Sequence, residues 1–104
     1  MIVVTSSVIE GRRIVKTLGM VKGSTIRARH LGRDISAGLR SLIGGEIKEY
    51  TKLMAEAREE AIQRMVEQAE EMKANAIVDT RFVTSMVISG ASELLVYGTA
   101  VVVK

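Results

Sequence analysis

The side chains that most often carry out chemistry are scarce in this sequence. His30 is the only histidine, and the chain contains no cysteine. Without cysteine there is no disulfide, zinc–thiolate site or thiol nucleophile, and one histidine cannot build a multi-histidine metal site within one chain. Copies of His30 from several subunits could form a metal-binding ring, but its neighbour Arg29 favours a basic surface histidine.

Paired carboxylates are the next candidates. Glu56 and Glu60, and likewise Glu67 and Glu71, are four residues apart, which places each pair on one face of a helix. With no histidine beside them, these pairs do not fit a di-iron pattern. They could hold Mg²⁺ loosely, although a solvated acidic helix face is the simpler interpretation.

The double glycine Gly44-Gly45 raises the question of a phosphate-binding loop. Such a loop presents free backbone amides at the N-terminus of a helix. Here Glu46 and Glu49 follow directly, and their carboxylates can take up the positive end of the helix dipole. No Gly-Lys-Ser/Thr sequence follows, and no clear strand precedes. The pair therefore indicates a joint between two helices, and we count Gly44 and Gly45 as structural residues.

Charge is distributed unevenly along the chain. Residues 1–52 carry ten Lys/Arg against four Asp/Glu, a net +6, whereas residues 53–104 carry five against eight, a net −3. The basic residues from Arg12 to Arg33 have no acidic residue between them. This segment could attract an anionic partner, or the acidic helix of a neighbouring subunit.

Aromatic residues are too few to support nucleic-acid binding by stacking. Tyr50, Phe82 and Tyr97 are the only aromatic residues, and all lie outside the basic segment. The basic segment therefore has no aromatic side chain on which the bases of a single strand could stack. Phosphate-backbone contacts need only Lys and Arg, so the sequence does not favour a nucleic-acid partner but leaves phosphate-backbone binding as an alternative.

The composition indicates one small domain, residues 1–104, with more apolar surface than one chain needs. Hydrophobic residues make up 47% of the chain, and the mean hydropathy is +0.20. Because a short chain leaves much of its surface exposed, we expect part of it to meet another subunit. The N-terminus resembles neither a signal peptide nor a membrane span, so we expect a cytoplasmic protein with no membrane partner.

Hydrophobic spacing divides the first part of the chain into short elements. Residues 2–5 predict a short strand. Residues 11–29 predict short extended pieces, with turns at Gly19 and Gly23. A change of period at Asp34 predicts a short helix over Asp34–Ile43.

The strongest element is a long helix from Glu46 to about Met72. Apolar and small residues recur along it at gaps of three and four, which is one face of an α-helix: Ile47, Tyr50, Met54, Ala57, Ala61, Met65, Ala69 and Met72. The small side chains of Ala57 and Ala61 would let the helix backbone lie close to its packing partner.

The sequence after Asn75 predicts a β-hairpin, because runs of β-branched residues lie on both sides of Gly90. The last strand is apolar on both faces, with Leu94, Val96, Ala100 and Val102 on one and Leu95, Tyr97, Val101 and Val103 on the other. Such a strand is normally covered on both faces, and one helix covers only one. We therefore expect a second copy of the protein to cover the other face.

Four segments of the chain match a known family in order and at similar spacing. They are Leu18–Gly23 (LGMVKG), Gly32–Ile62 (GRDISAGLRSLIGGEIKEYTKLMAEAREEAI), Ala74–Val78 (ANAIV) and Tyr97–Val103 (YGTAVVV). Through these segments, nearly the whole chain resembles the YbjQ-like family of small uncharacterised proteins.

The resemblance implies a two-layer α+β fold of the dodecin-subunit type. Its elements are short N-terminal strands, a short helix then a long helix, and a C-terminal antiparallel β-hairpin. It also implies a homopentameric ring whose short strands link subunits. The family is often labelled heavy-metal-binding, but the absence of cysteine and the single histidine argue against a thiolate or multi-histidine site within one chain. The cofactor is therefore left undefined.

One position departs from the family pattern. The family typically has glycine at the end of the long helix, where this sequence has Lys73. Asparagine tolerates the left-handed conformation that ends many helices, so we expect Asn75 to adopt it. We count Asn75 and Gly98 with the double glycine as structural residues.

These observations favour a non-enzymatic homo-oligomeric ring that binds a small ligand or a metal at subunit interfaces. Arg40, Tyr50 and Arg58 are the candidate ligand-binding or interface residues, because they lie within the matching segments and flank the packing face of the helix. One alternative is an anionic partner, a nucleic acid or an acidic surface, bound through residues 12–33. The other is an enzyme with an intersubunit site, for which we find no catalytic constellation.

Overall fold

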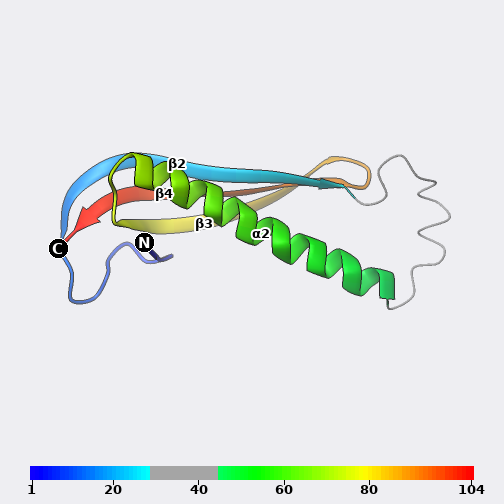
Figure 1. Ribbon diagram of the computed structural model, residues 1–104, viewed down its shortest axis with the longest axis horizontal. Helices are drawn as coiled ribbons and strands as arrows, with labels where there is room; N and C mark the ends of the chain where they lie inside the picture. Colours follow the sequence, from blue (N-terminus) through cyan, green and yellow to red (C-terminus); the bar gives the residue numbers. More distant parts are fainter. Residues whose placement is uncertain (29–44) are drawn as a thin grey trace.

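The computed structural model describes residues 1–28 and 45–104 (Figure 1). Its elements follow in the order β1 (Ile2–Val3), β2 (Ile14–Ala28), α2 (Gly45–Glu71), β3 (Ala76–Ile88) and β4 (Ala91–Val103). The predicted short helix over Asp34–Ile43, and Gly44 of the double glycine, lie outside the described residues.

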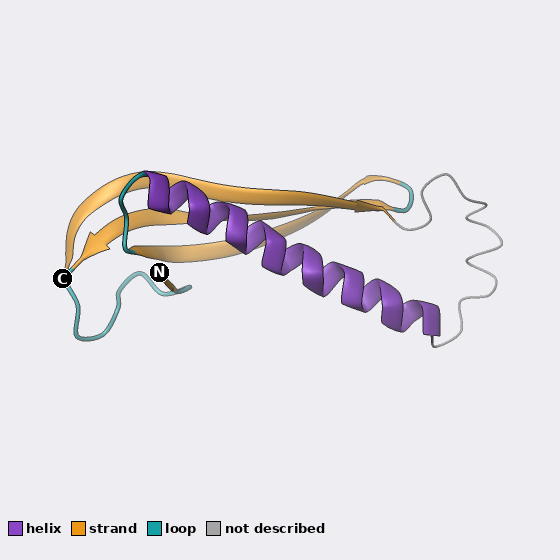
Figure 2. Cartoon of the chain, in the orientation of Figure 1, coloured by secondary structure: helices purple, strands orange, loops and turns teal. Residues whose placement is uncertain are grey.

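One mixed sheet forms the first layer of the fold, with the strand order β1-β3-β4-β2. Strand β4 runs antiparallel to both β2 and β3, while β1 pairs with β3 in parallel. Helix α2 forms the second layer, on one face of this sheet (Figure 2). The predicted α+β class, with a long helix followed by a C-terminal antiparallel hairpin, is confirmed.

Strand β2 corrects one prediction. It is a continuous strand of 15 residues, so the turns predicted at Gly19 and Gly23 are wrong. Gly19 has φ 136° and lies at a register shift between β2 and β4, where a bulge bends a strand without ending it. Gly23 lies directly under the helix, since a β-carbon there would be 2.1 Å from the carbonyl oxygen of Ala61. Gly19 is needed for the bulge and Gly23 for the close contact with the helix. Local sequence patterns reveal neither role.

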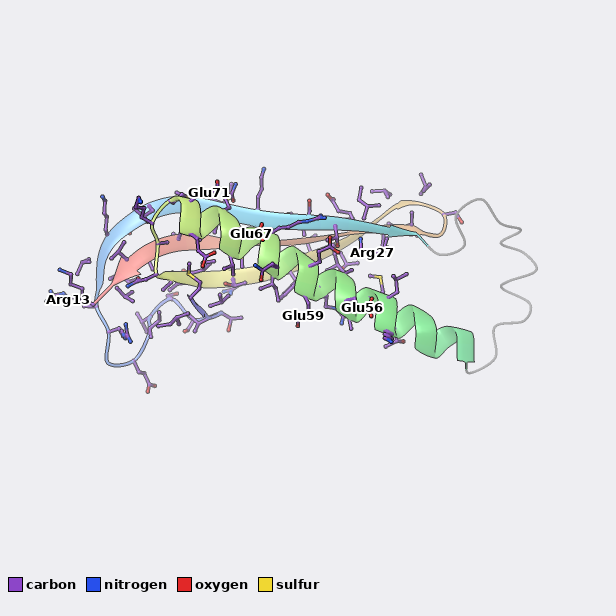
Figure 3. All side chains as sticks on the ribbon, viewed as in Figure 1. Arg13, Arg27, Glu56, Glu59, Glu67 and Glu71 are labelled. Carbon is purple, nitrogen blue, oxygen red and sulfur yellow. The ribbon has the colours of Figure 1, made fainter. Side chains whose placement is uncertain are left out.

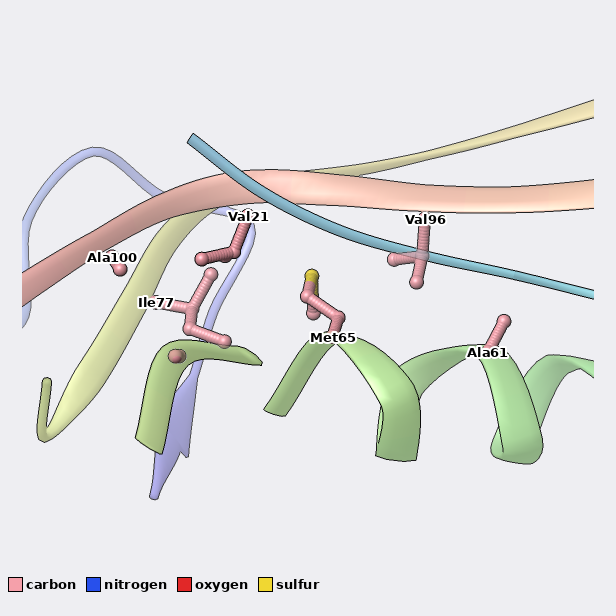
Figure 4. Packing of buried hydrophobic residues seen from close by; sticks show 7 residues of the cluster. Val21, Ala61, Met65, Ile77, Val96 and Ala100 are labelled. Atoms are coloured by element: carbon pink, nitrogen blue, oxygen red, sulfur yellow. The ribbon is translucent and has the colours of Figure 1, made fainter. Parts of the chain in front are cut away.

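The main core lies between α2 and the sheet (Figure 4). On the helix, Ala57, Ala61, Met65 and Ala69 of the predicted apolar stripe are fully buried. The last three of these form one buried cluster with sheet residues Val21, Ile77, Val96 and Ala100. The predicted role of the alanines is therefore observed, because their small side chains bring the helix backbone close to β2 at Gly23.

The opposite face of the sheet is covered over part of its length by the N-terminal segment, residues 1–13. A second buried cluster contains Ala76, Val78, Val101 and Val103, with Ile2, Val4 and Ile9 packed against it. The amide of Val4 donates to the carbonyl of Ile77 at 3.0 Å, which holds the segment in place. The expectation that a second copy covers Val101 and Val103 is wrong for this stretch, because the chain covers them itself.

The end of the helix corrects another prediction. Lys73, not Asn75, has the left-handed backbone conformation, with φ 68°. The amide of Ala74 donates to the carbonyl of Ala69 at 3.0 Å, and that of Lys73 to Glu70 at 2.9 Å. These two bonds form a Schellman motif, in which the left-handed residue follows the helix directly. Asn75 lies too far along the chain for that position.

Candidate functional site: the open face of the sheet

Toward the hairpin tip, α2 and the sheet diverge (Figure 1). Figure 1 shows the Gly45 end of the helix lying apart from the tip of the β3–β4 hairpin. We call residues Phe82–Ile88 of β3 and their partners Ala91–Val96 of β4 the distal sheet. Large apolar side chains are exposed there on both faces: Phe82, Val83, Met86, Val87 and Ile88.

Strand register decides which side chains share a face. Phe82 is paired with Val96, which is buried under the helix, whereas Val83 is paired with Leu95. Since successive side chains of a strand point to opposite faces, Val83 and Leu95 lie on the face away from α2. We call this side, where the N-terminal segment does not cover it, the open face.

A basic and aromatic row crosses the open face. Tyr97 of β4 is paired directly with Lys22 of β2 on one side and with Arg81 of β3 on the other. Val21 and Gly23 are buried toward the helix, so Lys22 between them points to the open face. Lys22 and Arg81 are exposed, and Tyr97 is partly exposed. Directly opposed residues have β-carbons about 5 Å apart, so two cations flank the tyrosine ring.

Arg81 is fixed beside the ring by the N-terminal segment. Its Nη1 donates to the carbonyl of Thr5 at 2.8 Å and to that of Thr80 at 2.9 Å. Among the described residues both bonds use Nη1, while a guanidinium has five N–H donors. The remaining donors of Arg81 are therefore free to meet a ligand.

A bulge next to this row helps to hold the N-terminal segment. Asp79 has φ 54° and lies at the register shift between β3 and β4. Its carboxylate accepts a hydrogen bond from the Ser7 hydroxyl at 2.8 Å, and its amide donates to the Ser6 carbonyl at 3.0 Å. Ionic pairing of Asp79 with Arg81 is absent from the described residues, because each is bonded to the N-terminal segment instead.

The hydroxyl of Thr80 lacks a hydrogen-bond partner in the described part of the chain, although the residue is buried. A β-carbon on the facing Gly98 would lie 3.2 Å from that hydroxyl and 2.7 Å from Cγ2 of Ile77. Gly98 thus leaves just enough room for the bulge. This gives Gly98 a packing role rather than a chemical one.

Two of the three ligand candidates predicted from the sequence lie on described parts of the backbone. Arg40 lies outside the described residues, and Tyr50 lies within α2. Arg58 is exposed on α2, next to the buried Ala57. Of the predicted structural residues, Gly45 begins the helix, and the Asn75 side chain both donates to the Val103 carbonyl and accepts from its amide, each at 2.8 Å.

Sequence reasoning missed the row of Lys22, Tyr97 and Arg81. These residues are far apart along the chain, and only the pairing of three strands brings them together. One signal was available, because the alternation of β4 places Tyr97 on the face opposite Val96. The partners of Tyr97 could not be deduced without the register.

Among the described acidic side chains of α2, Glu60 joins the helix to the sheet. Glu60 forms ion pairs with Arg27 of β2 and with Arg64, the latter at 2.6 Å. Figure 3 shows Glu56, Glu59, Glu67 and Glu71 spread along α2 from its middle to its C-terminal end. No group of three or more His, Cys, Asp or Glu side chains that could hold a metal occurs among the described residues.

Comparison with known proteins places the chain in a family. A family model described as "Putative heavy-metal-binding" matches residues 1–104. The chain belongs to the YbjQ-like family. A UPF0145 protein of Methanosarcina acetivorans is 61% identical over 97% of this chain and 95% of that protein. A UPF0145 protein of Dehalococcoides mccartyi is 56% identical over 100% of both chains.

A solved structure shows the same fold. The crystal structure of a protein of unknown function from Pediococcus pentosaceus, assigned to the DUF74 family, matches with a TM-score of 0.67. The match covers 100% of this chain and 98% of that chain at 15% identity. In the part of the chain that the structure describes, no helix is long and apolar enough to cross a membrane.

The metal named in the description of the YbjQ-like family does not fit the donors found here. Heavy metals prefer thiolate and imidazole ligands, but the sequence has no cysteine, and its one histidine, His30, lies outside the described residues. The described carboxylates are spread over α2, β3, β4 and the N-terminal segment, and no three of them lie together as a metal-binding group. One chain's described residues therefore provide no heavy-metal site.

Proposed function

We propose that this protein is a non-enzymatic homo-oligomer, a pentameric ring that holds a small ligand where its subunits meet. The observation that carries this proposal is the distal sheet, with apolar side chains exposed on both faces. Met86 is 74% exposed and Ile88 is 64% exposed. Contiguous exposed apolar side chains at this density are typical of interaction surfaces.

The free edge of β3 supports an assembly in which subunits pair through their strands. Strand β1 covers only the Ala76–Ile77 end of β3, so in the described residues Phe82–Ile88 pairs with β4 alone. An uncovered edge offers a row of unpaired backbone donors and acceptors to another chain.

The other edge of the sheet is already partly occupied. On β2, the Lys22 amide donates to the Gln68 side chain at 2.7 Å, and the Ser24 carbonyl accepts from Arg64. Side chains of α2 therefore block the middle of this edge. Two unlike edges favour a head-to-tail contact, which closes into a ring when the rotation permits.

The ligand part of the proposal rests on the oligomer. A ring creates pockets between subunits, where residues of two chains meet. Arg40, Tyr50 and Arg58 remain the proposed ligand or interface residues. Arg58 is exposed on the outer side of α2, where a neighbouring subunit can reach it.

The experiment is native mass spectrometry of freshly purified protein, combined with elemental analysis. The expected result is a pentamer with a stoichiometric excess mass over the sum of its chains. Met86→Lys should release monomers with an unchanged circular dichroism spectrum, because this side chain is exposed in the monomer but buried in the assembly. Val8→Lys is the matched control, since Val8 is 67% exposed on the N-terminal segment.

The outcomes separate assembly from ligand binding. A monomeric wild-type protein, or a Met86→Lys protein that stays oligomeric, would contradict the proposed assembly. A clean pentamer with no excess mass and no metal would contradict the ligand while leaving the ring intact.

A further inference from the structure

We propose that the open face binds a nucleoside phosphate at the row formed by Lys22, Tyr97 and Arg81. This goes beyond the ring proposed above and does not depend on it, since all three residues belong to one chain. The ring of Tyr97 would stack on the base, and the two cations would hold the phosphates.

The geometry of the row suits such a ligand. Neighbouring strands are about 4.8 Å apart, so the backbones of Lys22 and Arg81 are separated by roughly 10 Å with Tyr97 midway. A base lying over the tyrosine thus places its phosphates within reach of either flexible cation. Aromatic side chains stack on any base, because every base has a π-face.

The two cations are not equivalent. Arg81 is anchored through Nη1 by the carbonyls of Thr5 and Thr80, so its remaining donors are held in one orientation. Planar guanidinium groups bind phosphate through two parallel hydrogen bonds. Lys22 is exposed, and its side chain forms no hydrogen bond or ion pair among the described residues. It therefore acts as a mobile point charge.

Uncharged side chains, most of them apolar, lie around the row. Along β4, Leu95 and Thr99 lie on either side of Tyr97 on the same face, and both are partly exposed. Val83, which is paired with Leu95, is 42% exposed, and Met20, which is paired with Thr99, is 70% exposed. An apolar surround with a few polar anchors is the usual composition of a small-molecule site.

Charge along β4 sets one boundary of the site. Glu93 lies on the same face of β4 as Tyr97, four residues nearer the hairpin tip. It is paired with Ile26 of β2 and Ser85 of β3. Its carboxylate repels phosphate, so the phosphates should lie toward Lys22 and Arg81. A long anionic polymer crossing the distal sheet would meet this repulsion, which favours a single nucleotide over a nucleic-acid strand.

The test is isothermal titration calorimetry of the full chain with four probes: ATP, adenosine, inorganic tripolyphosphate and a decathymidine oligonucleotide. ATP should bind. Adenosine, which lacks the phosphates, and tripolyphosphate, which lacks the base, should each bind at least ~10-fold more weakly. Tyr97→Leu and Lys22→Gln should each weaken ATP binding about 10-fold. Tyr97→Phe should stay within about 2-fold of wild type, since stacking needs only the ring.

Two controls make the result specific. Lys16→Gln removes the same charge from the same strand, but Lys16 is paired with Val102, which belongs to the opposite set of alternating residues on β4. It should leave ATP binding within about 2-fold. The chain has two tyrosines, so in protein labelled with 3-fluorotyrosine the ¹⁹F resonance that is missing from Tyr97→Leu belongs to Tyr97. In the labelled wild-type protein, this resonance should shift on adding ATP.

Each remaining outcome counts against the proposal. Absence of ATP binding at about 1 mM ligand would overturn it, as would tripolyphosphate binding as tightly as ATP. Tight binding of the oligonucleotide without ATP would indicate a nucleic-acid surface instead. A purely structural role for Tyr97 would lower the melting temperature of Tyr97→Leu while leaving ATP affinity unchanged. Native mass spectra of the same samples report the number of subunits, so a failure of ATP binding can be told apart from a failure of assembly.

Discussion

Gly23 of β2 lies directly against the backbone of α2 at Ala61. A β-carbon built on Gly23 would lie 2.1 Å from the carbonyl oxygen of Ala61 and 2.6 Å from the amide nitrogen of Met65. Both contacts are with backbone atoms, which cannot rotate away. The spacing between helix and sheet at this point therefore depends on the absence of a side chain.

Gly23→Ala is expected to lower the free energy of unfolding by about 3 kcal/mol, because the helix must shift outward to admit one methyl group. Chemical denaturation followed by circular dichroism measures the change. Ser24→Ala is the control, since the Ser24 side chain makes no hydrogen bond among the described residues and only its carbonyl is used, by Arg64. Equal stability of Gly23→Ala and wild type would show that the layers are further apart than this contact indicates.

The long helix and the hairpin could be predicted from the sequence, because both depend on local periodicity. Ala57, Ala61, Met65 and Ala69 recur at helical spacing, and all four are buried. Strand β2 was predicted as broken pieces because Gly23 looks like a turn residue locally. Glycine is needed at position 23 because the backbone of α2 lies against it. The spacing of residues around position 23 does not reveal that contact.

The candidate site was less accessible to sequence reasoning than the fold. Tyr97 was assigned to a strand face, but its neighbours Lys22 and Arg81 follow only from the pairing of β4 with both β2 and β3. The bulge at Asp79 adds to the difficulty, since it shifts the alternation of β3 just before Arg81. A register shift of one residue moves every following side chain to the other face.

The left-handed conformation of Lys73 predicts a stabilising substitution. Lys73 has φ 68° in the Schellman motif that ends α2. This conformation strains any residue with a β-carbon, whereas glycine adopts it freely. Lys73→Gly should raise the free energy of unfolding by roughly 0.5–1 kcal/mol, after allowing for the greater flexibility of glycine in the unfolded chain.

Lys73→Ala is the matched comparison, because it removes the lysine side chain but keeps the β-carbon. It should leave stability close to that of wild type in thermal or urea unfolding. A Lys73→Ala protein as stable as Lys73→Gly would attribute the gain to the lost charge rather than to relieved backbone strain.

The Asn75 side chain joins the start of β3 to the end of β4. Its amide group donates to the carbonyl of Val103 and its oxygen accepts from the Val103 amide, each at 2.8 Å. Asn75→Ala should lower the free energy of unfolding by about 2 kcal/mol, because both backbone groups lose a partner at a partly buried position. Urea unfolding curves measure the loss.

Asn75→Asp tests the polarity of this contact. Aspartate keeps an acceptor for the Val103 amide but places its second oxygen against the Val103 carbonyl, where two acceptors repel. It should therefore be no more stable than Asn75→Ala at neutral pH. Wild-type stability in the aspartate variant would mean that only the bond from the Val103 amide matters.

Glu60 pairs with Arg27 and Arg64 at once, and its side chain is 40% exposed. Because solvent and salt screen such pairs, Glu60→Gln should cost only roughly 0.5–1 kcal/mol at low ionic strength. The difference from wild type should shrink in about 1 M sodium chloride, where the screening length falls to about 3 Å.

Glu56→Gln, one turn earlier on the same helix (Figure 3), is the control and should change stability less. A loss for Glu60→Gln that persists undiminished at high salt would show that packing or hydrogen bonding, rather than charge, holds β2 to α2 at this position.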